Sequence, residues 1–248
     1  SRLPMEIPPP LISLLRTCRN AAALTGAGVS QESGVPTFRD SLDGLWAKYR
    51  AEDLATHQAF RRDPQLVWDW YAMRRAKVDE VNPNPGHTAL AEMSRHIPHF
   101  TLITQNVDGL HEQAGSPQVI ELHGNIRRVK CFRCGRMASS WTDTGPGVPT
   151  CSSCGGLLRP DVVWFGEGLP AEAVQAAERA SRQCQVFLSI GTSGEVYPAA
   201  DLAYVAQRHG ATIVEINTGD TPLSPHVHFH LRGPSGVVLP TLVAAAWG

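Results

Sequence analysis

Five short apolar runs constrain the fold of this 248-residue chain more than any other feature. Several are rich in β-branched residues, and segments of helix length separate most of them. A chain that alternates in this way builds a parallel sheet with helices on both faces. We therefore predict an α/β fold with a Rossmann-like parallel sheet. The predicted strands are Ala21–Thr25, Thr101–Thr104, Val119–Leu122, Val186–Ile190 and Thr212–Ile216.

Two insertions interrupt this alternation and predict a small second domain at one edge of the sheet. Residues 41–96 form a helical insertion, with the clearest helix at Pro64–Val78. Residues 127–159 hold four cysteines and are rich in Gly, Pro, Ser and Thr, with too few large apolar residues to bury a core of their own. The sheet-bearing domain is expected to comprise residues 11–40, 97–126 and 160–248.

Composition excludes several classes of function. The formal net charge is −1, which gives no electrostatic reason for binding nucleic acid or a membrane surface. No apolar run approaches the roughly 20 residues that span a bilayer. The first ten residues lack the order of a secretory signal, so a cytoplasmic location is expected by default, with a removed transit peptide left open. A monomer is likewise the default expectation.

Four of the six cysteines predict a structural zinc site. Cys131, Cys134, Cys151 and Cys154 follow the spacing C-x2-C-x16-C-x2-C. Two such pairs can bring four thiolates to one tetrahedral ion, which leaves no position open for water. The alternatives are unlinked reduced pairs, a disulfide in an exported protein, or an iron–sulfur cluster.

A glycine-rich turn follows the first predicted strand. Gly26 and Gly28 would let backbone N–H groups approach a pyrophosphate closely. The third glycine of a dinucleotide fingerprint is absent at the usual spacing, and no acidic residue ends the second strand. A tight strand-to-helix turn without ligand is the alternative interpretation.

Polar residues follow the other four predicted strands, where an open parallel sheet binds ligands. These residues are Gln105-Asn106-Val107-Asp108, His123-Gly124-Asn125, Gly191-Thr192-Ser193 and Asn217-Thr218. Their agreement predicts one shared polar site. His123 directly follows a strand and suits proton transfer near neutral pH. His111 is its rival, although its place just after Gly109 favours a helix start.

These motifs together resemble the sirtuin family, over nearly the whole chain from about Leu11. The family's order is followed by the glycine turn, Gly34-Val35-Pro36-Thr37-Phe38-Arg39, the first three polar strand ends and the cysteine quartet. The short zinc insertion of this chain resembles that of prokaryotic members of the family. It implies an NAD-binding domain with NAD as cosubstrate. It places the NAD contacts at Gly26, Ala27, Gly28, Phe38, Arg39, Gln105, Asn106, Val107, Asp108, Gly191, Thr192, Ser193, Asn217, Thr218, Gly219 and Ser235, the last in a late loop.

The same resemblance implies protein lysine deacylation, with His123 and Asn106 as the catalytic residues. The acyl oxygen would attack the nicotinamide ribose, and neutral His123 would accept a proton, so the rate is expected to fall below a pH of about 6.5. The products would be nicotinamide, O-acyl-ADP-ribose and free lysine. The acyl-lysine of a protein or peptide would be added as a β-strand between two segments. The expected contacts there are Val162, Phe165, Gly166, Glu195 and Val196.

Within that family, Tyr71 and Arg74 resemble the Tyr-x-x-Arg motif of members that prefer succinyl, malonyl and glutaryl groups. The two residues are spaced i, i+3 and share a helix face, and a guanidinium suits a carboxylate. Ala55 would leave room for the longer acyl chain, and Thr37 also fits this subclass. Arg75 is expected to point elsewhere. Acetyl removal is predicted as well.

Four alternative functions remain. One is a general deacetylase without acidic-acyl preference, and another is an NAD-dependent ADP-ribosyltransferase that uses the same pocket. The remaining alternatives are a non-enzymatic binding module and a hydride-transferring dehydrogenase, although a binding module would leave His123 without a task.

Overall fold

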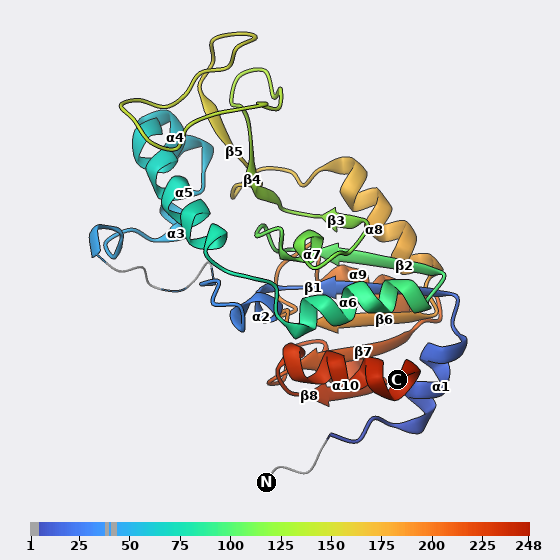
Figure 1. The fold of residues 1–248 in the computed structure, drawn as a ribbon. Coiled ribbons are helices and arrows are strands. Elements are labelled where there is room, and N and C mark those ends of the chain that lie inside the picture. Colours follow the sequence, from blue (N-terminus) through green and yellow to red (C-terminus); the bar gives the residue numbers. More distant parts are fainter. Residues whose placement is uncertain (1–4, 38–39, 41–43) are drawn as a thin grey trace.

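The computed structural model describes residues 5–37, 40 and 44–248, and its centre is a parallel sheet of six strands (Figure 1). The strand order is β3-β2-β1-β6-β7-β8. All five predicted runs are strands, with ends that differ by at most two residues. The strands are β1 (Asn20–Thr25), β2 (His99–Thr104), β3 (Val119–Glu121), β6 (Val186–Ile190), β7 (Thr212–Asn217) and β8 (Phe229–Arg232). The predicted α/β fold is confirmed.

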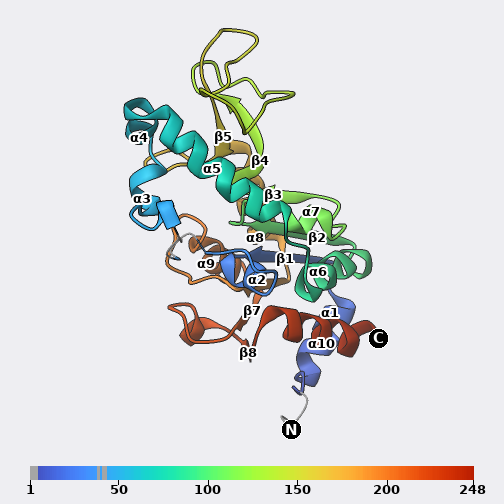
Figure 2. The same cartoon turned by 60° about the vertical axis from the view of Figure 1, so that its left-hand side comes forward.

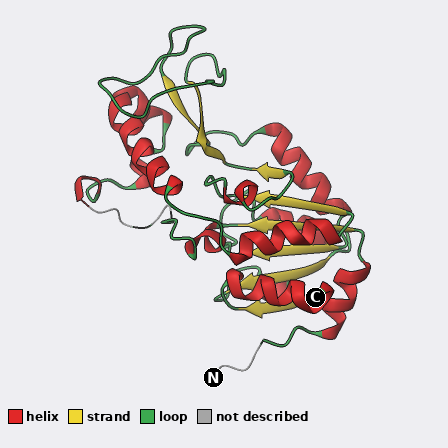
Figure 3. Cartoon of the chain, viewed as in Figure 1, coloured by secondary structure: helices red, strands yellow, loops and turns green. Residues whose placement is uncertain are grey.

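Helices cover both faces of the sheet (Figure 3). On one face lie α1 (Pro9–Thr17), α6 (Pro85–His96) and α10 (Ser235–Trp247), and on the other lie α8 (Ala171–Gln183) and α9 (Asp201–Arg208). The short helices α2 (Ala27–Gln31) and α7 (Leu110–Gln113) follow β1 and β2. None of the helices in the described part of the chain has the length and apolarity needed to cross a bilayer.

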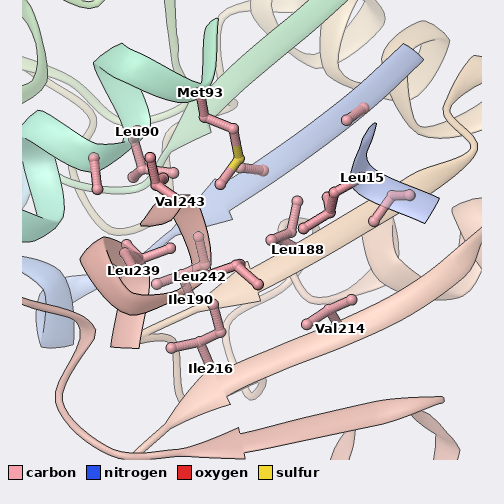
Figure 4. Packing of buried hydrophobic residues seen from close by; sticks show 14 of the residues in the cluster. Leu15, Leu90, Met93, Leu188, Ile190, Val214, Ile216, Leu239, Leu242 and Val243 are labelled. Carbon is pink, nitrogen blue, oxygen red and sulfur yellow. The ribbon is translucent and has the colours of Figure 1, made fainter. Parts of the chain in front are cut away.

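The core between the sheet and its first helical face is built from aliphatic side chains (Figure 4). Leu239 and Leu242 of α10 and Leu90 of α6 are fully buried, as are Leu188 and Ile190 of β6 beneath them. The central strands are buried on both sides, which explains why they read as continuous apolar runs.

The small domain combines helices and a hairpin that lie far apart in the sequence (Figure 2). Its helices are η1 (Gly44–Trp46), α3 (Ala51–Leu54), α4 (His57–Arg62) and α5 (Pro64–Asp79). Strand β4 (Gly124–Cys131) pairs antiparallel with β5 (Leu158–Val162). An aromatic core that includes Phe60, Trp70 and Tyr71 joins these parts.

This packing divides the chain differently from the expected boundaries. Helix α6 contributes Leu90 and Met93 to the core under the sheet, so residues 85–96 pack with the sheet-bearing domain. The expected limits at residues 126 and 159 also cut through β4 and β5, which are continuous strands. Strands β4 and β5 contain polar residues and form no continuous apolar run, so their signal in the sequence is weak. The same holds for β8, which was not predicted.

Gly124 marks the point where the chain leaves the sheet for the small domain. Its φ is +82°, a conformation that other residues rarely adopt, and a Cβ there would lie 2.1 Å from the Asp161 carbonyl oxygen. Asp161 pairs with Asn125 in the hairpin. Glycine at 124 is therefore required both by the backbone angle and by the close approach of β5.

We predict that Gly124→Ala lowers the free energy of unfolding by roughly 3 kcal/mol, since backbone strain and a clash add together. Gly115→Ala is the matched control. Gly115 also has a positive φ (+98°), but no atom lies within 4 Å of its added Cβ, so a loss of roughly 1 kcal/mol is expected. Denaturant unfolding measures both values, and equal losses would contradict this account.

Candidate functional site

The polar strand ends meet at one edge of the sheet, as the sequence predicted. Gln105, after β2, donates from Nε2 to the Thr192 hydroxyl at 3.0 Å. Asn217, at the end of β7, donates from Nδ2 to the Thr192 carbonyl at 2.9 Å. Thr192 itself follows β6. Strand β1 lies between β2 and β6, so this edge is the switch point at which open α/β sheets bind ligands.

The glycines after β1 and β6 pack against one another at this edge. The Gly28 amide donates to the Gly191 carbonyl at 2.8 Å. A Cβ on Gly26 would lie 2.8 Å from the Gly191 oxygen, and a Cβ on Gly28 would lie 2.8 Å from the Gly191 Cα. The close packing of the two loops therefore requires these glycines. Between the strand ends, the surface at these positions is formed by backbone atoms without side chains.

A cavity of about 670 Å³ opens from this edge toward the small domain. Both domains line it, and it contains about half of the predicted site. The predicted residues on its wall are Ala27, Tyr71, Arg74, Gln105, Asn106, Val107, Asp108, His123, Val162, Phe165, Gly166 and Val196, together with Thr37. Phe38 and Arg39 lie outside the described residues.

The remaining predicted NAD contacts lie off this wall. Gly26, Gly191, Thr192, Ser193, Thr218 and Gly219 lie in the loops that follow β1, β6 and β7, while Gly28 lies in α2 and Asn217 ends β7. Ser235 is the first residue of α10, not part of a loop as expected, and its buried Oγ has no hydrogen-bond partner among the described residues. Their roles remain predictions.

His123 lies on the cavity wall, in the turn between β3 and β4. Its Nδ1 lies 3.0 Å from the Gln105 carbonyl oxygen, which can only accept. Nδ1 therefore carries the proton, and Nε2 keeps its lone pair. Burial lowers the pKa of the imidazole, while the carbonyl contact works in the opposite direction. The neutral, proton-accepting form is favoured.

His111, the rival candidate, is a buried structural residue. It lies in α7, and its Nε2 is 2.8 Å from the Thr25 hydroxyl. Burial and the neighbouring His87 lower its pKa to about 3. His111 is not among the described residues that line the cavity, whereas His123 is.

Hydrogen bonds hold Asn106 and Asp108 in place beside His123. The Asn106 amide nitrogen donates to the Gly26 carbonyl at 2.9 Å, which leaves its oxygen as an acceptor. The Asp108 carboxylate accepts from the Ser30 hydroxyl at 2.7 Å and from the Leu110 amide at 2.9 Å. Ser30 was not predicted. It lies in α2 and joins both residues, which the spacing along the chain does not reveal.

Tyr71 and Arg74 of α5 line the small-domain side of the cavity. Burial raises the pKa of Tyr71 to about 12, so the phenol stays protonated. The Arg74 guanidinium lies 4.9 Å from the centre of the Trp70 ring, and burial lowers its pKa without removing its charge. Both side chains line the same cavity, which agrees with residues spaced i, i+3 on one helix face.

Arg75 points away from the cavity, as expected, but it is not a solvated neighbour. Its side chain is buried and donates to both Asp143 oxygens, at 2.7 and 2.9 Å, and to the Ile126 carbonyl at 2.7 Å. Because its removal would leave Asp143 without that partner, Arg75 is unsuitable as a neutral control for Arg74.

A buried ion pair that the sequence analysis missed supports the wall that carries Val162 and Phe165. Arg159 of β5 donates to both Glu167 oxygens, at 2.7 and 3.1 Å, and to the Val162 carbonyl at 2.8 Å. The pair lowers the Glu167 pKa against the opposing effect of burial. The feature that marks this pair as important is the burial of Arg159, and the sequence alone does not show which arginines are buried.

The two segments expected to hold an acyl-lysine expose apolar side chains at the cavity mouth. Phe165 is 53% and Val196 is 40% exposed. The Val163 amide donates to the His123 carbonyl at 2.9 Å, which ties one segment to the candidate base. Ala55 is buried off the cavity wall, and its carbonyl accepts from the Phe165 amide at 2.9 Å. Glu195 also lies off the described wall.

The four cysteines of the quartet converge at the tip of the β4–β5 hairpin. All four sulfur atoms lie within 4.8 Å of one another. Cys131 and Cys154 are 3.5 Å apart and Cys134 and Cys151 are 3.9 Å apart, too far for a disulfide. Tetrahedral zinc–thiolate bonds require sulfur separations of about 3.8 Å. Backbone amides also donate to Cys131, Cys151 and Cys154. The donor set fits one structural zinc ion.

We predict about one zinc ion per chain by elemental analysis, because four thiolates complete a tetrahedral shell. Cys131→Ser is expected to lose the metal and to lower the melting temperature. Cys184→Ala is the control, since Cys184 lies in the core beneath α8 and α9, and this variant should keep its zinc. Iron in place of zinc, or full zinc content in Cys131→Ser, would contradict the assignment.

Comparisons with known proteins agree with the resemblance inferred from the motifs. A family model described as the Sir2 family matches residues 26–198. The "NAD-dependent protein deacylase" of Aquifex aeolicus is 51% identical over 214 residues, which are 86% of this chain and 89% of that protein. The protein of the same name from Pyrococcus furiosus is 51% identical over 90% of this chain and 91% of its own length.

Two solved structures are similar over almost their whole length. A "Sir2 homolog-NAD complex" superposes with a TM-score of 0.91 at 45% identity, covering 99% of this chain and 96% of that one. A "Sir2 bound to acetylated peptide" superposes with a TM-score of 0.83 at 31% identity, covering 95% and 96%.

Proposed function

Because the chain belongs to the Sir2 family, which is the sirtuin family expected from its motifs, we propose that it is an NAD-dependent protein lysine deacylase. The observation that carries the proposal is the position of His123. Its unprotonated Nε2 and the Asn106 side chain lie on the wall of a cavity that joins the dinucleotide edge of the sheet to the small domain. A relative of known structure holds NAD, and another holds an acetylated peptide.

The strand-end residues fit an NAD molecule across the switch point. The close-packed Gly26, Gly28 and Gly191 leave backbone where a Cβ would otherwise fill space. Gln105, Thr192 and Asn217 form a continuous polar row over β2, β6 and β7. We assign the nicotinamide half to the cavity and the adenosine half to the loops beyond Gly191 and Asn217.

When bound, NAD supplies an electrophilic ribose carbon that accepts the acyl oxygen as nicotinamide leaves. The chain's own residues do the rest. Asn106 offers its amide oxygen to the site, because its nitrogen is held by Gly26. His123 accepts a proton at Nε2, while the Gln105 carbonyl holds its Nδ1 proton in place. The apolar wall at Val162 and Phe165 restricts water.

The acyl group proposed for this site carries a carboxylate, as in succinyl- or malonyl-lysine, and acetyl-lysine is also accepted. Arg74 keeps its charge in a half-buried position on the cavity wall, where a carboxylate would meet it away from bulk water. Tyr71 lies one turn away and stays neutral. Phe165 and Val196 flank the cavity mouth, where the peptide backbone would add as a strand.

Replacing Arg74 is the direct test of this acyl preference. We expect Arg74→Met to lower kcat/KM for a succinyl-lysine peptide by about tenfold to a hundredfold, since a charge-assisted hydrogen bond is lost. Turnover of the acetyl version of the same peptide should change less than about threefold, because acetyl presents no carboxylate. Steady-state kinetics on the peptide pair with NAD measures both.

Lys77→Met is the matched control. Lys77 lies one turn farther along α5, also lines the cavity, and is exposed, so it contributes the same charge without the buried contact. Its loss should leave the succinyl-to-acetyl ratio near that of the wild type. Equal effects of the two substitutions would mean that general electrostatics, not Arg74, selects the acyl group. No effect of Arg74→Met on either substrate would leave a general deacetylase.

His123→Ala is expected to lower kcat by about 10²- to 10⁴-fold, the usual contribution of a general base. In the wild type, the neutral imidazole is the active form and its pKa is lowered, so the acid limb of the kcat/KM profile should lie below pH 6.5. His209→Asn, at an exposed site directly after α9, should change neither. A half-maximal rate above pH 6.5 would contradict the burial argument.

A further inference from the structure

A buried hydrogen bond links Trp164, in the segment that carries Val162 and Phe165, to Tyr71 of helix α5. The indole Nε1 of Trp164 lies 3.1 Å from the phenol oxygen of Tyr71. Both side chains are only 1% exposed, so no water competes for the contact. Trp164 also lines the cavity between Val163 and Phe165.

The direction of this bond follows from the chemistry of the two groups. An indole nitrogen can only donate, whereas a phenol can both donate and accept. Trp164 therefore occupies a lone pair of the Tyr71 oxygen, and the phenol proton must point elsewhere. Among the described residues, none accepts that proton from Tyr71. The neighbouring Arg74 on the cavity wall is a cation and has no acceptor atom to offer. The phenol proton is thus left for a ligand.

We propose that Trp164 is a specificity-determining positioning residue, which fixes the Tyr71 hydroxyl as a hydrogen-bond donor toward the carboxylate of an acidic acyl group. The inference rests on the proposed deacylase function. A freely rotating phenol could turn a lone pair toward that carboxylate and repel it. With one lone pair held by the indole, Tyr71 presents its proton beside Arg74, and the two donors together suit a carboxylate.

The surroundings of Trp164 hold the indole rigidly enough for this task. The Arg159 guanidinium lies 3.6 Å from the centre of its ring. The Trp164 backbone amide donates to Glu167 at 2.9 Å, and Glu167 in turn is paired with Arg159. The Phe60 ring packs at 5.4 Å and His57 at 5.6 Å, edge-on. The Arg159–Glu167 ion pair therefore holds Trp164 at both its ring and its backbone amide.

Replacement of the indole N–H alone tests the proposal. Trp164→Phe removes the donor but also leaves a space, so a second variant carries the tryptophan isostere 3-benzothienylalanine at position 164, with sulfur in place of N–H. Each is assayed on the succinyl and acetyl forms of one peptide, in the wild-type and Tyr71→Phe backgrounds. Thermal unfolding shows whether each variant is folded.

We expect the isostere to raise the KM for the succinyl peptide by about tenfold, with kcat nearly unchanged, because one well-aligned hydrogen bond to a charge is weakened. The acetyl KM should stay within about twofold. In the Tyr71→Phe background the isostere should have no further effect on the succinyl-to-acetyl ratio, since the bond it removes is already absent.

Two results would overturn the inference. One is an equal loss on both peptides for the isostere, which would make Trp164 a packing residue. The other is an isostere effect of the same size in the Tyr71→Phe background. Failure of the underlying function looks different, because the wild type would then show no NAD-dependent desuccinylation, or Arg74→Met would leave it unchanged.

Discussion

The arrangement of this site depends on the contacts of one buried group, the guanidinium of Arg159. It is 4% exposed and holds Glu167, the Val162 carbonyl and the face of Trp164 at once. A buried charge of this kind is tolerable only when all its donors are satisfied, and here a single side chain joins a strand of the hairpin to the loop that follows it. Movement of the loop would leave the buried guanidinium without its partner, so this contact favours one position of the wall that carries Val162 and Phe165.

The large domain contributes a second constraint, the close approach of the β1 and β6 turns through Gly28 and Gly191. The packing of the two loops by itself requires these glycines. The bare backbone that results is also what a bound pyrophosphate would need, and that role stays a prediction. From this edge, the Gln105–Thr192–Asn217 row extends over three strands, and the Gln105 carbonyl fixes the tautomer of His123. One residue thus links the polar row to the candidate base.

The strands of the sheet were predictable because central parallel strands are buried on both faces and read as apolar runs. The cysteine quartet was predictable because metal ligands must recur at fixed spacing. Strand β8 and the hairpin were not, since their partly polar residues form no continuous run. The burial of individual polar residues was even less predictable from the sequence. Nothing in the order of residues shows that Arg75 and Arg159 are enclosed while Lys77 is exposed, or that Ser30 joins Asn106 to Asp108. These depend on contacts between distant parts of the chain.

The central claim is that the two domains bring an acyl-lysine and NAD together so that the acyl group leaves the peptide on ADP-ribose. Mass spectrometry of one reaction, with a succinyl-lysine peptide and NAD, tests it most directly. The account predicts equal amounts of unmodified peptide and O-succinyl-ADP-ribose, with one nicotinamide released for each. A peptide that keeps its succinyl group while an acceptor protein gains ADP-ribose would contradict it, and so would loss of the succinyl group without consumption of NAD.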